Sequence, residues 1–231
     1  SLYLLSYGLI AVAISRKEIN TKRYESKMNF REYWLSVKNI YKKIRYDQVL
    51  GLIPQHFDIL LLSLLGDLTL VGIYKFAKRL VEPINYIVTG FNPWIQNQYS
   101  NRKIIDFSDF VKKLLLPLST VILLIFITTG KKIIELIGSN EFASAYEPMI
   151  ILTFGYLIYL LTFWIRQALL FNELIIYHAY GRLIYSFVFI ILSIPLTYFF
   201  NVAGLAYSLS SAIALQKIFE YIVYKKKIIS E

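Results

Sequence analysis

The sequence predicts an all-α polytopic membrane protein, a helical bundle with six full transmembrane helices and one partial helix at the N-terminal end. Composition is the first observation behind this prediction. The 231 residues are 57% hydrophobic and 17% charged, with a mean hydropathy of +0.53, whereas soluble domains carry about 25% charged residues. The second observation is that the apolar residues fall in long runs. Together they exclude a disordered chain, a disulfide-stapled secreted module and a soluble enzyme core.

Each full span is identified by its length, because a helix that crosses a bilayer takes about 20 mainly apolar residues. Six runs have about this length: 47–66, 71–98, 110–129, 146–171, 175–200 and 202–224. Residues 131–147 are expected to form a loop with a short amphipathic stretch. The apolar run at 1–14 is shorter, and we expect it to be the end of a truncated transmembrane helix.

The runs divide the chain into four parts. Residues 1–14 are the partial helix, 15–46 a basic linker with an amphipathic helix, 47–225 the six-helix bundle and 226–231 a tail. The amphipathic helix is predicted because apolar and aromatic residues of the linker recur at helical spacing, which is typical of a helix on a membrane surface.

The positive charges indicate how the chain is oriented in the membrane. The chain has 25 Lys and Arg against 15 Asp and Glu, a net charge of +10, and ten of the cations lie in 16–45. Lys and Arg are retained in cytoplasmic loops, so the linker, the connection flanked by Arg166 and Arg182 and the C-terminus are predicted to be cytoplasmic. Arg166 and Glu220 are interpreted as marking the membrane boundary. The excess charge thus reports topology and contact with the bilayer, and no nucleic-acid partner is expected.

A stripe of polar residues follows one face of the span 71–98 at three- and four-residue steps. Its members are Lys75, Lys78, Arg79, Glu82, Asn85, Tyr86, Thr89, Asn92 and Gln96. A Lys or Arg that faces lipid costs about 2.5–3.5 kcal/mol, so the stripe should face a wet cavity. Such a cavity suits a phosphate or pyrophosphate head group. The alternative is structural, with Lys78 and Arg79 paired to Glu82 and Lys75 reaching to the interface. The candidate substrate-binding residues are Lys75, Lys78, Arg79, Glu82 and Asn85.

Two titratable residues, His56 and Asp58, lie in the middle of the span 47–66. A carboxylate inside a membrane must be paired or protonated. The pair could therefore couple transport to protons or sodium ions, or Asp58 could be the partner of Lys75 or Arg79. The remaining reading is a satisfied hydrogen bond between helices.

Enzyme chemistry finds no support in the sequence. The chain has no cysteine and two histidines, and the motifs of serine hydrolases, zinc proteases, ATP-binding loops and dinucleotide-binding loops are all missing. We expect neither catalysis, nor a metal, nor a cofactor.

Three stretches resemble one protein family. They are the run Phe57–Leu62 followed by Leu65–Ala77, the stretch Ile137–Met149 before the span 146–171, and Phe200–Ala206 at the start of the last span. In order and spacing they are similar to bacterial polysaccharide flippases, the oligosaccharide and O-antigen exporters of the MATE-like (MOP) superfamily. The resemblance covers about residues 47–227.

The resemblance implies two six-helix bundles around a central cavity, of which this chain looks like the C-terminal one. The N-terminal bundle would be its missing partner. It further implies that the substrate is an undecaprenyl-pyrophosphate-linked oligosaccharide, moved across the bacterial cytoplasmic membrane by alternating access that an ion gradient drives. A polysaccharide polymerase and a chain-length regulator are the further partners that such a protein would have.

Three other functions stay open. A multidrug or ion antiporter of the same superfamily would have the same bundle with a less cationic cavity. A membrane polymerase or ligase of lipid-linked sugars would be expected to carry a large outer loop, whereas the predicted outer loops are short. The third alternative is a non-transporting scaffold of an assembly complex.

Overall fold

The computed structural model describes residues 57–64, 68–100, 107–138, 140–172 and 174–229. All of them belong to the second of the two units into which the chain divides, Ser1–Lys42 and Lys43–Glu231. The predictions for 1–46 and for His56 lie outside the described residues. Within the described ranges the chain is helical and contains no strand, so the all-α prediction is confirmed there.

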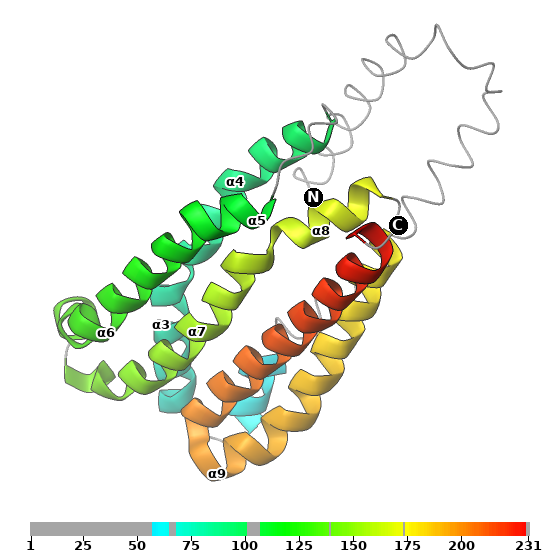
Figure 1. Cartoon of the computed structure of the whole chain (residues 1–231). Coiled ribbons are helices and arrows are strands. Elements are labelled where there is room, and N and C mark those ends of the chain that lie inside the picture. The colour runs from blue at the N-terminus through cyan, green and yellow to red at the C-terminus, as the bar shows by residue number, and fades with distance from the viewer. Residues whose placement is uncertain (1–56, 65–67, 101–106, 139, 173, 230–231) are drawn as a thin grey trace, which may run out of the picture. The chain divides into compact units, whose positions relative to one another are not determined.

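Residues 57–64 form a helical segment that precedes the labelled elements (Figure 1). The elements that follow it are α3 (Leu68–Val81), α4 (Pro83–Ser100), α5 (Phe107–Phe110), the π-helical turn η1 (Val111–Leu115), α6 (Leu116–Gly138), the 3-10 turn η2 (Asn140–Ala145), α7 (Tyr146–Thr162), α8 (Trp164–Phe171), α9 (Ile175–Tyr224) and the π-helical turn η3 (Lys225–Ile229).

Three helical stretches are long and apolar enough to cross a membrane: Val111–Gly138, Glu141–Phe171 and Ile175–Ile229. The last of these contains two of the predicted spans, joined at Asn201. The described residues therefore support membrane insertion by length and composition, and the prediction of six full spans goes beyond what these three stretches show.

The predicted span 71–98 is not one helix, because it breaks at Glu82 between α3 and α4. Proline has no N–H to donate, and it disfavours the helical conformation of the residue before it. Pro83 begins α4 for these reasons. The Glu82 N–H still bonds to the Lys78 carbonyl oxygen at 3.0 Å, and the Glu82 oxygen accepts the Asn85 N–H at 2.8 Å. The break is thus a tight turn that keeps the polar residues of both helices close.

The prediction that a loop begins at residue 131 is wrong, because α6 continues to Gly138. Lys131 and Lys132 favoured a loop, but both are exposed and leave the apolar periodicity of the helix unchanged. The Lys131 ammonium lies 5.3 Å from the centre of the Tyr146 ring, a favourable cation–π distance. The connection to α7 is therefore only as long as the turn η2.

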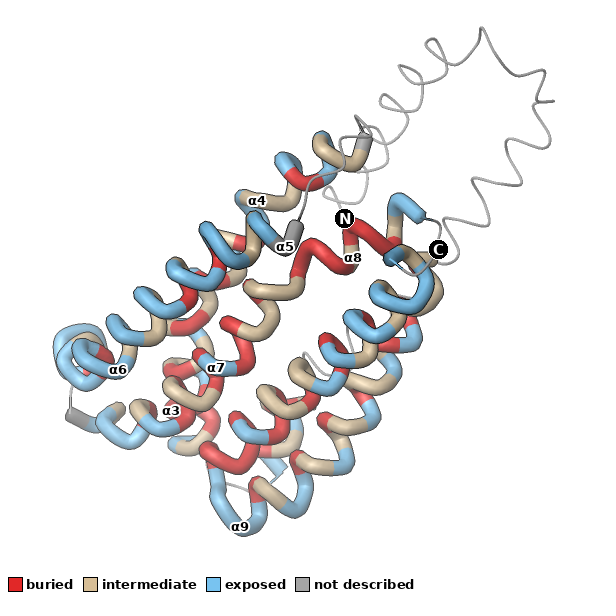
Figure 2. The backbone as a smooth tube through the Cα atoms, viewed as in Figure 1, coloured by how far each residue is buried: buried red, intermediate tan, exposed pale blue. Residues whose placement is uncertain are grey.

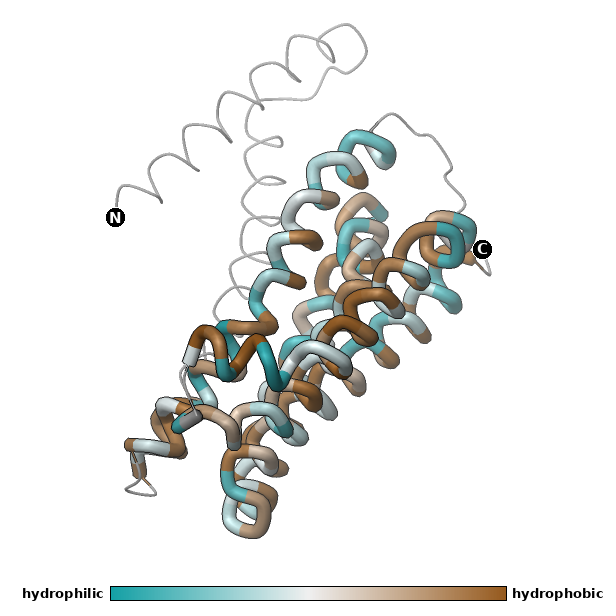
Figure 3. Tube along the Cα trace, turned by 90° about the vertical axis from the view of Figure 1, so that its left-hand side faces the viewer, coloured by the Kyte–Doolittle hydropathy of each residue, from teal (hydrophilic) through white to brown (hydrophobic). Residues whose placement is uncertain are grey.

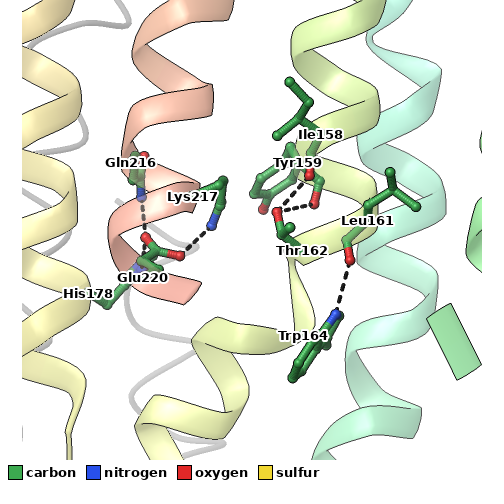
Figure 4. Close-up of polar contacts among 9 residues, drawn as sticks. All are labelled: Ile158, Tyr159, Leu161, Thr162, Trp164, His178, Gln216, Lys217 and Glu220. Atoms are coloured by element: carbon green, nitrogen blue, oxygen red, sulfur yellow. Dashed lines mark hydrogen bonds and ion pairs between the residues drawn. The ribbon is translucent and has the colours of Figure 1, made fainter. Parts of the chain in front are cut away.

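The predicted span 146–171 bends at Phe163 between α7 and α8. The Thr162 hydroxyl donates to the carbonyl of Ile158 at 2.6 Å, and the indole N–H of Trp164 donates to the carbonyl of Leu161 at 3.0 Å (Figure 4). Threonine bonds of this kind to a carbonyl one turn back often bend helices. The two side chains therefore hold the bend in place.

Helix α9 is a hairpin of two arms that run side by side (Figure 1). The arms meet at Asn201, whose φ of 50° and ψ of −129° are not helical. A Cβ on Gly204 would lie 1.9 Å from the carbonyl oxygen of Leu196, so the backbones approach too closely there for any side chain. The predicted ends of the two spans, Phe200 and Val202, are confirmed by this turn.

Helix α7 lies at the centre of the packing, with contacts to α3, α4, α6 and α9. Its buried character is visible in Figure 2, where α6 by contrast is largely exposed. A Cβ on Gly155 would meet the Ser210 Cα at 2.9 Å, and the Ser210 hydroxyl donates to the Ile151 carbonyl oxygen at 2.8 Å. Small residues of this kind let helix backbones approach closely, as is common between membrane helices.

Much of the apolar surface is left uncovered. Only 11% of the most apolar part of Val111–Gly138 is buried, against 67% in Glu141–Phe171. Figure 3 shows apolar residues along the whole length of several helices, and large exposed side chains include Leu124, Phe187 and Ile218. A soluble monomer rarely exposes so much apolar surface. Exposed apolar side chains are expected, however, on a surface that is in contact with lipid.

Candidate functional site

A polar cavity of about 600 Å³ opens among apolar helices. Its walls come from residues 57–64, from α3 and α4, from α7 and from both arms of α9. Polar and tyrosine side chains contribute most of the lining. A cavity of this size lies within the range of small-molecule sites in proteins.

One wall of the cavity is the polar stripe that the sequence predicts. Lys78, Glu82, Asn85, Thr89 and Asn92 all line it. Their spacing of four, three, four and three residues places them on one helical face that the turn at Glu82 does not disrupt. Three of the five candidate substrate-binding residues, Lys78, Glu82 and Asn85, thus line one cavity.

Two predicted members of the site, Lys75 and Arg79, do not join it. Both side chains are exposed, and neither lines the cavity. On α3, Lys78 is therefore the one member of the stripe that lines the cavity, because Lys75 and Arg79 lie on other faces of the helix. The cationic wall therefore depends on Lys78 together with residues from elsewhere in the chain.

Lys78 is fixed by a buried carboxylate. Its ammonium lies 2.6 Å from Oδ2 of Asp58, whose side chain is 1% exposed. The other oxygen of Asp58 accepts the N–H of Ile59 at 2.8 Å. The lysine also lies 5.7 Å from the centre of the Tyr74 ring. Asp58 is thus the partner of Lys78, whereas the sequence leaves Lys75 or Arg79 as one possible partner of Asp58, and Glu82 as the alternative partner of Lys78.

The opposite wall holds cations that sequence reasoning did not place in the site. Arg182 comes from the first arm of α9, and Lys217 comes from the second arm, next to Gln216. The position of Arg182 near the end of a span suggested a topological marker instead. A charged i,i+3 pair, Lys217 and Glu220, inside an apolar run was the available signal for the second arm.

A buried polar cluster joins the two arms of α9 behind this wall (Figure 4). Oε1 of Glu220 lies 2.8 Å from Nδ1 of His178 and accepts the Gln216 amide N–H at 2.6 Å. Oε2 of Glu220 accepts from the Lys217 ammonium at 2.7 Å. The sequence suggests a boundary residue, but the Glu220 side chain is 0% exposed and has three partners between the helices.

The lysine of this cluster repeats the arrangement seen at Lys78. The Lys217 ammonium lies 5.1 Å from the centre of the Tyr159 ring, and its partner carboxylate is fully buried. Each of the two cavity lysines is thus bonded to a buried carboxylate and lies against a tyrosine ring. Cation–π contact and an ion pair both stabilise a charge that has left water.

The charges around the cavity balance. Three cations line it, Lys78, Arg182 and Lys217, and Glu82 lines it as well. The carboxylates of Asp58 and Glu220 lie directly behind two of the cations. With His178 neutral, three positive charges face three negative ones. The attraction of the cavity for an anion therefore depends on how tightly the carboxylates hold the lysines.

In the part of the chain that the structure describes, no three metal-ligating side chains come together. No known protein family, curated protein or solved structure matches the chain.

Proposed function

We propose that the protein is the C-terminal half of a flippase that moves an undecaprenyl-pyrophosphate-linked oligosaccharide across the bacterial cytoplasmic membrane for surface polysaccharide synthesis. The observation that carries the proposal is a polar cavity lined by three cations, two of which, Arg182 and Lys217, lie on α9 within a stretch apolar enough to span a membrane. The resemblance of 47–227 to oligosaccharide exporters supplies the substrate class. The C-terminus and the linker 15–46 are cytoplasmic in this proposal, following the distribution of cations.

The cavity offers contacts that suit both parts of such a head group. The ammonium groups of Lys78 and Lys217 and the guanidinium of Arg182 would bind the pyrophosphate oxygens. The side chains of Asn85 and Thr89 have the donors and acceptors that sugar hydroxyls need. The isoprenoid tail would stay in the bilayer against the exposed apolar surface.

Transport would proceed by alternating access, in which this bundle rocks against a second bundle that provides the opposite wall. The close packing of α7 against α9 at Gly155 and Ser210 favours motion of this unit as one body. In this proposal the cavity of the described helices is one half of the substrate site.

One observation favours the second candidate, an ion or multidrug antiporter of the same superfamily. The three cations of the cavity are matched by three carboxylates, and a neutral polar cavity also suits a cationic or uncharged substrate. Efflux of cationic dyes from cells with the gene, without any change in surface polysaccharide, would favour this antiporter.

The flippase is tested by exchanging cavity cations in cells that carry the variant gene in place of the natural one. Lys78→Ala, Arg182→Ala and Lys217→Ala should each reduce surface polysaccharide, while lipid-linked precursor accumulates. Lys75→Ala and Arg79→Ala remove the same charge from exposed positions on α3, and they are the matched controls with normal export. Protein levels in the membrane must be equal. Normal export in all three cavity variants at equal levels would refute the assignment of the site.

A further inference from the structure

The cluster between the arms of α9 is almost dry. His178 is 1% exposed, Gln216 5%, Lys217 3% and Glu220 0%. Burial of so many polar groups is costly unless each finds partners, and here one carboxylate serves the other three. Gly181 leaves the space for it, because a Cβ there would lie 3.0 Å from Oε1 of Glu220.

Lys217 belongs to this cluster and to the cavity at once. Its ammonium bonds to Glu220, yet the side chain also lines the cavity and lies against the ring of Tyr159. An anion in the cavity and the carboxylate of Glu220 would therefore compete for the same ammonium. If the anion draws Lys217 away, Glu220 loses its counter-charge inside the protein, which is unfavourable.

His178 is the group that can replace that charge. Its Nδ1 donates to Glu220 when the carboxylate is ionised, so a proton added at Nε2 would make the ring a cation in contact with Oε1. Histidine is also the side chain whose ordinary pKa lies nearest neutral pH. The ring is thus suited to gain a proton when Lys217 turns to a ligand.

The other titratable groups around the cluster come from α9 itself, from α7 and α8, and from Lys78 and Glu82, which line the same cavity as Lys217. The first arm of α9 contributes Arg182 and Tyr185, both in the cavity wall, and α7 contributes Tyr156 and Tyr159. Helix α8 carries one charged residue, Arg166, which is half-buried and does not line the cavity. Among all of these and the cluster itself, His178 is the one group that ordinarily gains a proton between pH 6 and 8.

We propose that His178 and Glu220 form a proton-binding site linked to the cavity through Lys217, so that the protein takes up one proton when the cavity binds a phosphate-like anion. The inference rests on the proposed function, because it requires an anionic head group in the cavity. The direction of the pH dependence follows from the reciprocity of linked binding. An anion that promotes proton uptake must itself bind more tightly as the pH falls. Where uptake reaches one proton, the affinity should rise up to about tenfold per pH unit.

The test uses the protein in lipid nanodiscs with sulfate as the probe. Sulfate is a tetrahedral dianion whose charge is constant between pH 6 and 8, so any proton that is taken up belongs to the protein. Calorimetric titrations in buffers of different ionisation enthalpy count the protons bound per sulfate. The expected result is about one proton per sulfate and tighter binding at pH 6 than at pH 8, with chloride at equal ionic strength as the reference.

Variants assign the proton to the cluster. His178→Gln keeps a donor for Glu220 but cannot gain a charge, so sulfate should bind without proton uptake and with little pH dependence. Lys217→Met should weaken sulfate binding and abolish the uptake. Lys226→Met removes the same charge from the exposed C-terminal turn and should change neither property. Glu220→Gln, which releases Lys217, is a second route to binding without uptake; because the loss of this carboxylate is itself destabilising, its folding in the nanodisc is verified before the titration.

Each outcome decides between the two proposals. Sulfate binding without proton uptake in the natural protein, or uptake that persists in both His178→Gln and Glu220→Gln, would overturn the proton linkage and leave the proposed flippase standing. Failure of both sulfate and inorganic pyrophosphate to bind would overturn the anion site and the linkage with it.

Discussion

Lys217 and Glu220 form an ion pair with 2.7 Å between Nζ and Oε2, although their side chains are 3% and 0% exposed. Taking both charges out of water costs several kcal/mol per ion before they attract each other. The additional bonds from His178 and Gln216 to Oε1 offset part of that cost. The ion pair is therefore stable only together with His178 and Gln216, and removing any one of the four side chains leaves buried polar groups without a partner.

This dependence predicts a strong effect of Glu220→Gln on stability. The substitution leaves Lys217 charged and without its carboxylate, which should lower the free energy of unfolding by about 3–5 kcal/mol. In the double variant Lys217→Met with Glu220→Gln no charge is stranded, so much of the loss should be recovered. Unfolding by SDS in mixed micelles measures both. Equal losses in the single and double variants would contradict this account.

The crossing at Gly204 predicts a second effect on stability. A Cβ there would lie 1.9 Å from the carbonyl oxygen of Leu196, and backbone atoms cannot move aside without opening the turn. Gly204→Ala should therefore lower the free energy of unfolding by at least about 1–3 kcal/mol, the usual cost of overpacking. Gly72→Ala on α3 is the matched control, because nothing lies within 4 Å of its Cβ position. It should be neutral or stabilising by about 0.5–1 kcal/mol, and a thermal melt in detergent separates the two.

Asn201 offers a test in the opposite direction. Its φ of 50° lies where side chains are strained and glycine is not. Asn201→Gly should therefore keep or raise the melting temperature, whereas the β-branched Asn201→Val should lower it, with a difference of about 1–3 kcal/mol between them. Equal melting temperatures would mean that the turn relaxes to another backbone conformation.

Binding measurements can separate the lysine in the cavity from its exposed neighbours. Lys78→Gln should weaken sulfate binding at least several-fold, because its ammonium is in the wall of the cavity. Lys75→Gln and Arg79→Gln should each change the affinity less than about twofold, since exposed charges at a distance are screened by salt. Equal weakening by all three would indicate a general field effect in place of a defined site.

Asp109 and Lys113, 2.5 Å apart at the start of the third described stretch, predict how an exposed ion pair behaves. The Lys113 ammonium lowers the pKa of Asp109 below its usual value. Any stabilisation is present above the ordinary carboxylate pKa and is lost as the pH falls through the lowered one. Both side chains are more than half exposed, so Asp109→Asn should leave the melting temperature at pH 7 unchanged.

Local features of the fold could be predicted from the sequence. The two arms of α9 follow from two apolar runs on either side of Asn201, and the polar stripe from Lys78 to Asn92 follows from helical spacing. The break at Glu82 was missed although Pro83 announces it, because the apolar run continues past the proline. The length of α6 was missed because Lys131 and Lys132 look like a loop but are compatible with an exposed helix face.

The second wall of the site could not be predicted in the same way. A lysine such as Lys217 in an apolar run shows that a polar environment must exist, but it does not show which distant residues provide it. The contacts of His178 with Glu220, 42 positions apart, depend on how two helices cross. That crossing is set by close approaches such as the one at Gly181, which no pattern within a single helix reveals.

The turn at Asn201 has a mechanical consequence for the hairpin. One end of the hairpin is closed by a single residue, and the other is tied by the bonds of His178 to Glu220. Two helices that are joined at both ends resist separating and sliding, so we expect the two arms of α9 to move together as one rigid unit. A movement that widens the cavity is therefore expected between α9 and the helices α3 and α4, which form another part of its wall.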